Sequence, residues 1–284
     1  MTTPHTAVPQ IIVILKADQL YAEILRQIVQ NEFSSARVIV TASTTEAELA
    51  LRTSRCDLFI TGLSATSDGD VLDLLYRHGH LQKLARRIMV VTSRREFRLL
   101  TALKNLGVDG VFDALAESPD RLIAALRAVS GNSVYWSPSI IEHLRRIGSA
   151  TTTLFRMLTN FEQMVLSVIG DGSDDQSAAL ELGLSTATIC SVRRELHRKL
   201  GVQHRGALVR LAAQHGFVRF TPSGVVRPGF ALLAAAHQAK RAKRATVVAK
   251  FKTALAGGPS LAPTILQDRP TLFHKAKNFP AVRN

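Results

Sequence analysis

Short apolar runs and amphipathic stretches alternate through about the first 130 residues. The runs are rich in Val and Ile and recur about every 20 to 25 residues, at 11–15, 36–40, 56–60, 87–91 and 110–115. The stretches between them carry Leu, Ile and Ala at spacings of three and four, the period of a helix that packs on one side. Nearly continuous apolar strands that alternate with helices predict a parallel sheet covered by helices on both faces. We therefore expect residues 9–132 to form an α/β domain with a five-stranded parallel sheet.

Four positions mark the ends of the expected strands. Asp18 follows the first run, Gly62 the third and Thr92 the fourth, while Ala114 lies near the end of the fifth. The carboxyl ends of parallel strands meet at one edge of an open sheet, and functional groups gather there. Any chemistry of this domain is therefore expected at these positions.

This arrangement resembles the receiver domain of bacterial response regulators over about residues 10–130. The resemblance implies an acidic pair that binds magnesium, an aspartate that accepts a phosphoryl group, a Ser or Thr, and a lysine, in that order along the strand ends. Here Ala17-Asp18 keeps one carboxylate, Gly62 takes the acceptor position, Thr92 supplies the hydroxyl and Ala114 takes the lysine position. A single carboxylate provides too few of the oxygen ligands that magnesium needs. We expect no bound metal, and a domain that serves dimerisation or partner docking rather than phosphorylation.

The loop after the third run holds further carboxylates and leaves two interpretations open. Asp68 could be a relocated phosphoryl acceptor. Alternatively, Asp68-Gly69 forms a turn and Asp70 lies beside the positive end of the next helix. We favour the second interpretation.

Residues 158–218 carry helix signals in close succession. Thr159 followed by Glu162 is a capping box, and Gly183 ends a second helix before Ser185 begins a longer one. One stripe of the longer helix is apolar, and the opposite stripe is polar and basic. The apolar stripe contains Ile189, Val192, Leu196 and Leu200. Two helices joined by a tight glycine turn, the second with a basic face, predict a helix-turn-helix.

This block resembles the LuxR/NarL (GerE-type) DNA-binding domain across about 60 residues. The matching positions are Leu158-Thr159, Glu162, Val165-Leu166, Gly172, Ala179, Leu182-Gly183-Leu184-Ser185, Thr188-Ile189 and Arg198-Lys199-Leu200-Gly201-Val202. The resemblance implies four helices, of which the third reads double-stranded DNA and the last, about 203–215, forms a homodimer. The residues that we expect at the DNA are Thr186, Thr188, Cys190, Ser191, Arg194, Arg198 and Lys199.

Two departures weigh against DNA binding. Cys190 stands where many members of the family have a lysine, and Asp174-Asp175 precede a helix whose start usually approaches a phosphate. A protein-interaction module that no longer reads DNA therefore remains an alternative, as does a phosphorylation-switched regulator that uses Asp68.

The net charge of +14 is concentrated at the C-terminal end. Residues 219–284 hold 12 Lys and Arg against one acidic residue. An alanine-rich helix ending at Gly257-Gly258 is expected there, with a basic cluster of Lys240, Arg241, Lys243 and Arg244. Auxiliary phosphate contact, a solvated tail and an amphipathic membrane contact all remain open, and the membrane is the least favoured.

Other classes of protein are disfavoured. The two cysteines are far apart, and neither a signal peptide nor an apolar run of about 18 residues is present, so we expect a cytoplasmic protein. No combination of nucleophile, base and oxyanion donors is evident, so we expect neither an enzyme nor a cofactor. The expected organisation is a receiver-like domain (9–132), a linker with a short helix (133–153), a helix-turn-helix domain (154–218) and a basic extension (219–284). The expected function is sequence-specific, phosphorylation-independent regulation of transcription.

Overall fold

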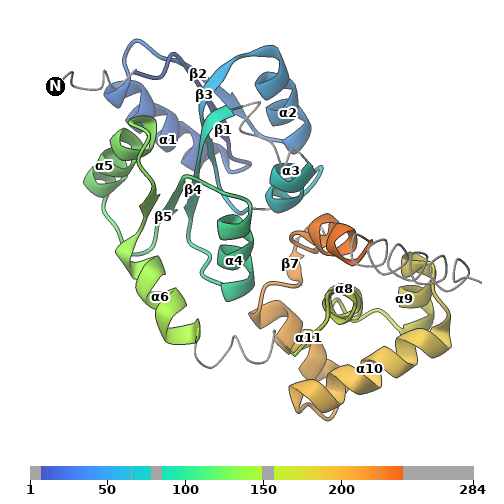
Figure 1. Ribbon diagram of the computed structural model, residues 1–284. Coiled ribbons are helices and arrows are strands. Elements are labelled where there is room, and N and C mark those ends of the chain that lie inside the picture. The colour runs from blue at the N-terminus through green and yellow to red at the C-terminus, as the bar shows by residue number, and fades with distance from the viewer. Residues whose placement is uncertain (1–7, 65, 78–84, 149–156, 223, 239–284) are drawn as a thin grey trace, which may run out of the picture. The chain divides into compact units, whose positions relative to one another are not determined.

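The computed structural model describes residues 8–64, 66–77, 85–148, 157–222 and 224–238 (Figure 1). Residues 8–148 are called the α/β domain below, and residues 157–238 the helical domain. The strands of the α/β domain are β1 (Ile11–Leu15), β2 (Arg37–Thr41), β3 (Cys56–Thr61), β4 (Ala85–Thr92), β5 (Gly110–Asp113) and β6 (Tyr135–Trp136). Its helices are α1 (Gln19–Glu32), α2 (Thr44–Thr53), α3 (Val71–Arg77), α4 (Phe97–Asn105), α5 (Pro119–Ser130) and α6 (Pro138–Gly148).

The strands form one parallel sheet in the order β2-β1-β3-β4-β5-β6. The five predicted strands are all present, but the predicted strand number was wrong because β6 adds a sixth. The Tyr135 N–H donates to the Asp109 carbonyl at 3.0 Å, and the Ser137 N–H donates to the Val111 carbonyl at 2.9 Å. A strand of two residues is too short to show an alternating pattern in the sequence.

Alternate residues of the strands face two separate layers of helices. Ile12 and Ile14 of β1 pack with residues of α1 and α5, whereas Val13 and Leu15 pack with residues of α2, α3 and α4. Figure 1 shows α1 and α5 on one side of the sheet and α2, α3 and α4 on the other. Because both faces of the sheet are covered, the central strands β1, β3 and β4 are mainly apolar on both sides, as the sequence predicts.

The predicted linker helix is part of the α/β domain. Ile140 of α6 is fully buried in the layer that contains α4. The Ser139 hydroxyl donates to the buried Asp113 carboxylate at 2.7 Å, and Arg95 forms an ion pair with the same carboxylate at 2.6 Å. These contacts attach the start of α6 to the end of β5, so α6 packs as part of the α/β domain.

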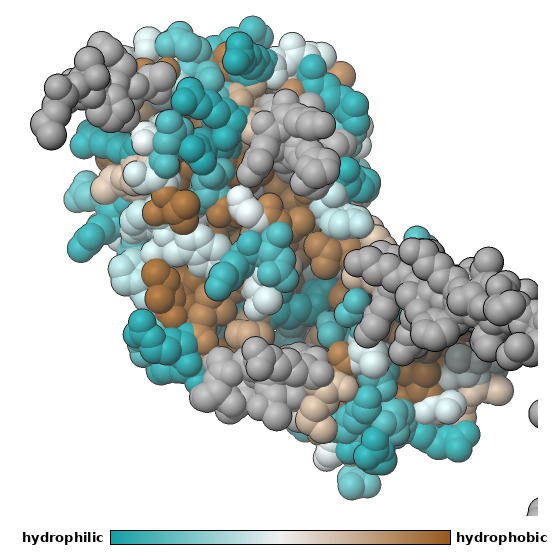
Figure 2. Space-filling view, viewed as in Figure 1, coloured by the Kyte–Doolittle hydropathy of each residue, from teal (hydrophilic) through white to brown (hydrophobic). Residues whose placement is uncertain are grey.

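A hydrophobic surface groove of about 680 Å³ lies beside α6. Its apolar lining includes Val134, Trp136, Ile141 and Leu144. Val134 is 70% exposed and Ile141 is 45% exposed. Figure 2 shows hydrophobic residues gathered next to α6 on this face of the domain.

The helical domain consists of four helices followed by a hairpin and a further helical segment. The helices are α8 (Asn160–Ile169), α9 (Asp175–Leu182), α10 (Thr186–Leu200) and α11 (Arg205–Gln214). The antiparallel hairpin is β7 (Arg219–Thr221) with β8 (Gly224–Val226), and residues 230–238 are helical. The fully buried core of these helices contains Val165 of α8, Ile189 and Leu196 of α10, and Leu208 of α11.

The first part of the basic extension packs on the helical domain. Leu233 is buried with the core residues of α8, and the rings of Phe161 and His237 stack with their centroids 5.0 Å apart. Arg227 forms ion pairs with Asp171 and Glu181. The first part of the predicted helix is therefore present over 230–238, whereas its predicted end at Gly257-Gly258 lies outside the described residues. The basic residues Lys240, Arg241, Lys243 and Arg244 lie outside the described residues.

Candidate nucleic-acid interface

A tight turn joins α9 to α10. Asp174 caps α9 by accepting the Ser177 N–H at 2.6 Å, and Gly183 ends the helix in the left-handed conformation with φ of 63°. Glycine reaches this conformation without the steric cost that a Cβ would add. Ser185 then caps α10 by accepting the Thr188 N–H at 3.1 Å. The predicted helix-turn-helix is present, with Gly183 ending the first helix and Ser185 beginning the second, as the sequence indicates.

The long helix α10 separates an apolar from a polar face, as predicted. Ile189 and Leu196 are fully buried against the rest of the helical domain. Thr186, Ser191 and Arg194 are exposed on the opposite side. An exposed helix of 15 residues whose free face carries hydroxyls and a guanidinium is the kind of element that enters the major groove of DNA.

Arg194 is the most available cation on this face. Its Nη2 lies 3.6 Å from the Cys190 sulfur, and no acidic side chain pairs with it among the described residues. Cys190 is half-buried, and its sulfur lies next to the guanidinium groups of Arg193 and Arg194. The Thr188 hydroxyl is also engaged, because it lies 2.8 Å from the Ser185 hydroxyl. The guanidinium of Arg194 can therefore bind a phosphate or a guanine edge without first losing a carboxylate partner.

Arg198 is also exposed but has a partner on the same helix. Its Nε donates to Glu195 at 3.0 Å, and its side chain is 70% exposed. An exposed pair of this kind is weak, because water and salt screen the two charges. Because this pair is weak, Arg198 could exchange Glu195 for a phosphate.

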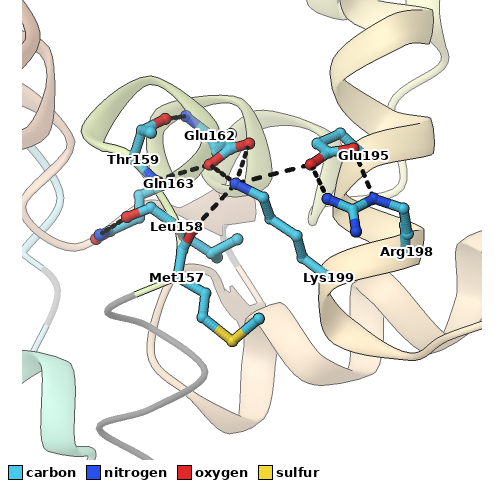
Figure 3. Close-up of polar contacts among 8 residues, drawn as sticks. All are labelled: Met157, Leu158, Thr159, Glu162, Gln163, Glu195, Arg198 and Lys199. Carbon is cyan, nitrogen blue, oxygen red and sulfur yellow. Dashed lines mark hydrogen bonds and ion pairs between the residues drawn. The ribbon is translucent and has the colours of Figure 1, made fainter.

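Lys199 does not share the exposed face, and its position weighs against the DNA contact that the sequence predicts for it. Its Nζ donates to both carboxylate oxygens of Glu162, at 2.8 and 2.9 Å, and to the Met157 carbonyl at 3.0 Å. Its side chain is only 17% exposed, and Figure 3 shows it directed from α10 toward the start of α8. Lys199 therefore holds the two helices together.

Glu162 has two structural tasks. Its carboxylate accepts the Thr159 N–H at 2.7 Å, which completes the predicted capping box, and it also pairs with Lys199. Burial by itself would raise the pKa of Glu162, but the hydrogen bonds from Lys199 and Thr159 outweigh burial and hold the pKa below its ordinary value. The carboxylate thus stabilises the folded state in its charged form.

Glu162→Gln should lower the free energy of unfolding near pH 7 by roughly 1–3 kcal/mol, since it removes charge-assisted hydrogen bonds from Lys199. Because the folded pKa of Glu162 is lowered, its contribution is present above the unfolded pKa and is lost as the pH falls through the folded pKa. The difference between wild type and variant should therefore shrink in acid. Thermal unfolding at a series of pH values measures the difference in stability between wild type and Glu162→Gln. Glu195→Gln, in a solvent-screened exposed pair, should lower the free energy of unfolding clearly less than Glu162→Gln. An equal loss in both variants would refute the structural role of Glu162.

The acidic residues at the start of α9 do not form a free negative patch. Arg193 donates from Nε and Nη2 to the Asp175 carboxylate at 2.9–3.1 Å, and Arg205 lies 3.6 Å from it. Asp174 is occupied with capping. Sequence reasoning missed Arg193, because its partner lies 18 residues away across the helix pair. The departure at Asp174-Asp175 therefore does not oppose DNA as strongly as the sequence alone indicates.

Two carboxylates near the strand ends of the α/β domain, Asp18 and Asp68, accept N–H groups at the starts of helices. The exposed Asp18 accepts the Tyr21 N–H at 3.0 Å at the start of α1. Asp68 accepts the N–H groups of Thr44 and Thr45 at 2.8 and 2.7 Å, at the start of α2. Although burial opposes the shift, these hydrogen bonds and one from the Thr66 hydroxyl hold the pKa of Asp68 far below its ordinary value.

The other receiver positions lie where the sequence predicts. Gly62 directly follows β3, Thr92 ends β4 and Ala114 follows β5. The Thr92 hydroxyl is buried and accepts the Arg94 N–H at 2.9 Å. Within the described residues, no group of three or more His, Cys, Asp or Glu side chains could hold a metal ion. None of the described helices is long and apolar enough to cross a membrane.

Comparisons with known proteins match both domains. A family model described as "Bacterial regulatory proteins, luxR family" matches residues 156–212. The nitrate/nitrite response regulator protein NarP of Escherichia coli is 30% identical over 161 residues, which cover 56% of this chain and 71% of NarP. The transcriptional regulatory protein MctR of Rhizobium johnstonii is 31% identical over 101 residues, which cover 36% of this chain and 46% of MctR. The chain thus spans about half the length of MctR.

A solved structure also shares the fold. RcsB from Salmonella enterica serovar Typhimurium, bound to promoter rprA in the presence of the phosphomimetic BeF3-, matches with a TM-score of 0.52 and 22% identity. The match covers 71% of this chain and 96% of that chain. The fold is therefore of the class in which a receiver-like α/β domain precedes a helix-turn-helix domain. The chain belongs to the luxR family of bacterial regulatory proteins.

Proposed function

We propose that the chain is a sequence-specific regulator of transcription that binds double-stranded DNA through α10. The observation that carries the proposal is Arg194, an exposed guanidinium on the free face of α10 with no acidic partner among the described residues. Thr186 and Ser191 supply hydroxyls on the same face, and Arg198 supplies a second cation that is only weakly paired. The names of NarP and MctR and the promoter complex of RcsB describe those proteins, and they agree with this proposal.

Arg194→Ala should weaken binding to the preferred duplex by roughly 1–3 kcal/mol, or about 5- to 150-fold, because it removes a base or phosphate contact. The duplex is first selected by the wild-type protein from a random oligonucleotide library. Fluorescence anisotropy at several salt concentrations then gives the affinity. Arg145→Ala is the matched control, since it removes one exposed arginine from α6 in the other domain.

The salt dependence separates the possible roles of Arg194. If it contacts a base, the loss should be larger for the selected duplex than for unrelated DNA. If Arg194 contacts a phosphate, the affinities for the selected duplex and for unrelated DNA should both fall. The dependence of the affinity on salt concentration should then become less steep. Equal affinity of Arg194→Ala and wild type for the selected duplex would refute the proposal and favour a protein-interaction module that does not read DNA.

We further propose that regulation does not depend on phosphorylation. Gly62 has no side chain that could accept a phosphoryl group, and the nearby carboxylates of Asp18 and Asp68 are engaged with backbone N–H groups. The observation on Asp68 weighs against the alternative of a relocated acceptor, because its lone pairs are already used to cap α2. Such a regulator would work in the bacterial cytoplasm.

The α/β domain is proposed to provide a surface for dimerisation or for a protein partner. The hydrophobic groove beside α6 supports this, because Val134 and Ile141 expose apolar surface there. Ile141→Asp should reduce a dimer to a monomer if the groove is the dimer interface. Light scattering measures the mass, and an unchanged dimer would place the interface elsewhere.

A further inference from the structure

A lysine lies at the position of the missing phosphoryl acceptor. β1 and β3 are paired in parallel, with Leu15 opposite Thr61, so Lys16 and Gly62 are the next residues on two adjacent strands. A Cβ atom added to Gly62 would lie 3.1 Å from the Lys16 Nζ and 3.6 Å from its Cδ. The end of the lysine side chain therefore occupies the space into which an aspartate at this position would extend.

The surroundings hold the Lys16 side chain in this place. Its Nζ lies 3.5 Å from the Ser64 hydroxyl and 4.7 Å from the centroid of the Tyr21 ring. A cation over the face of an aromatic ring is attracted by the negative charge density of that face. Burial lowers the pKa of Lys16 and the charge of Asp18 opposes that shift. The backbone is fixed as well, because the Lys16 N–H donates to the Thr41 carbonyl at 3.0 Å.

The magnesium ion that a receiver domain implies does not fit these residues. Magnesium is held by carboxylates and waters in octahedral geometry. The expected acidic pair contributes Ala17, which has no ligand atom, and Asp18, whose carboxylate caps α1. The side chain that does reach the position is an ammonium, and two cations a few ångströms apart repel each other.

We propose that Lys16 is a built-in cation that takes the place of the metal in this domain and excludes divalent cations from it. This inference rests on the proposed phosphorylation independence and gives it a second cause besides Gly62. The positive charge at the strand ends of this domain would then come from Lys16 and would not depend on a bound metal ion. A carboxylate restored at position 62 would pair with Lys16 instead of recruiting a metal.

The test compares three variants of the full chain for binding of Mn²⁺, followed by electron paramagnetic resonance. Wild type and Gly62→Asp should bind little. The double variant Lys16→Asp/Gly62→Asp should bind at least about tenfold more tightly than Gly62→Asp, because the local charge changes by two units and a second carboxylate is added. Lys16→Met/Gly62→Asp, which only removes the ammonium, should lie between them.

Stability provides a separate readout. Gly62→Asp should unfold at a higher temperature than Gly62→Asn, because only the carboxylate pairs with Lys16, and Lys16→Met should abolish that difference. If Lys16→Asp/Gly62→Asp does not fold, the comparison of Gly62→Asp with Lys16→Met/Gly62→Asp replaces it. Equally tight Mn²⁺ binding by Gly62→Asp and the variants without Lys16 would overturn the inference.

Failure of this inference can be told apart from failure of the proposed function. Labelling of the wild-type chain by acetyl phosphate on Asp18 or Asp68, with a change in DNA affinity, would refute phosphorylation independence whatever the metal results are. Metal binding by Gly62→Asp without labelling of the wild-type chain would leave that proposal intact and reject only the role of Lys16.

Discussion

Leu196→Ala should lower the free energy of unfolding of the helical domain by roughly 2–5 kcal/mol. Leu196 is 0% exposed and lies at the centre of the apolar face of α10. Removing its isobutyl group loses the hydrophobic transfer energy and leaves a cavity that α8 and α11 can fill only in part. The loss should also weaken DNA binding, because α10 is positioned by this core.

Leu180→Ala is the matched control for this prediction. Leu180 lies on α9 of the same domain but is 85% exposed, so the same atoms are removed without a cavity and the change should stay within about 0.5 kcal/mol. Hydrogen exchange measured by mass spectrometry reports the helical domain directly, whereas fluorescence of the single tryptophan, Trp136, reports the α/β domain. If Leu196→Ala and Leu180→Ala protect the amides of the helical domain equally from hydrogen exchange, Leu196 does not contribute to the core as proposed.

Gly170→Ala should destabilise the helical domain by about 1–3 kcal/mol or more through overpacking. A Cβ on Gly170 would lie 2.4 Å from the Ala212 Cβ and 2.5 Å from the Leu166 carbonyl oxygen. Neither atom belongs to a flexible side chain, so α11 would have to move away from Gly170 and the last turn of α8 would have to change its geometry. The backbone of Gly170 has φ of −70°, which alanine adopts freely, and the effect is therefore steric.

Two variants separate this steric effect from a general effect of alanine. Gly206→Ala, in α11, places its Cβ no closer than 3.4 Å to any of its neighbours, so it should be neutral or stabilising by less than about 1 kcal/mol. Ala212→Gly should recover part of the stability lost in Gly170→Ala, because it removes the other half of the clash. Urea unfolding gives the free energy of unfolding of Gly170→Ala, Gly206→Ala and the double variant Gly170→Ala/Ala212→Gly. If the two substitutions in the double variant lower this free energy additively, the clash between positions 170 and 212 is contradicted.

Features that depend on nearby residues could be predicted from the sequence. The capping box joins Thr159 to Glu162, three residues apart, and the glycine that ends α9 is followed at once by the cap of α10. The longer strands of the α/β domain were predictable because burial on both faces makes them mainly apolar, with little alternation. In each case the physical cause lies within one turn or one strand.

Features that depend on distant residues were missed. Lys199 has the residue type and spacing of a DNA contact, but its ammonium is held by Glu162, 37 residues earlier. Asp18 seemed to be a remnant of a metal site, whereas the β1 and β3 register brings Lys16 to Gly62 instead. β6 has only two residues and exists because it pairs with the edge of β5. No local pattern records any of these contacts.

The packing of residues 227–238 limits how this chain can be recombined with its relatives. The family match ends at residue 212, yet Arg227 pairs with Asp171 and Glu181, and Leu233 is buried on α8. A hybrid that joined the four helices of another regulator to this C-terminal segment would leave Arg227 without its two carboxylates unless the donor also carried them. In a designed hybrid, the four helices α8 to α11 and residues 227–238 should therefore be taken from the same protein.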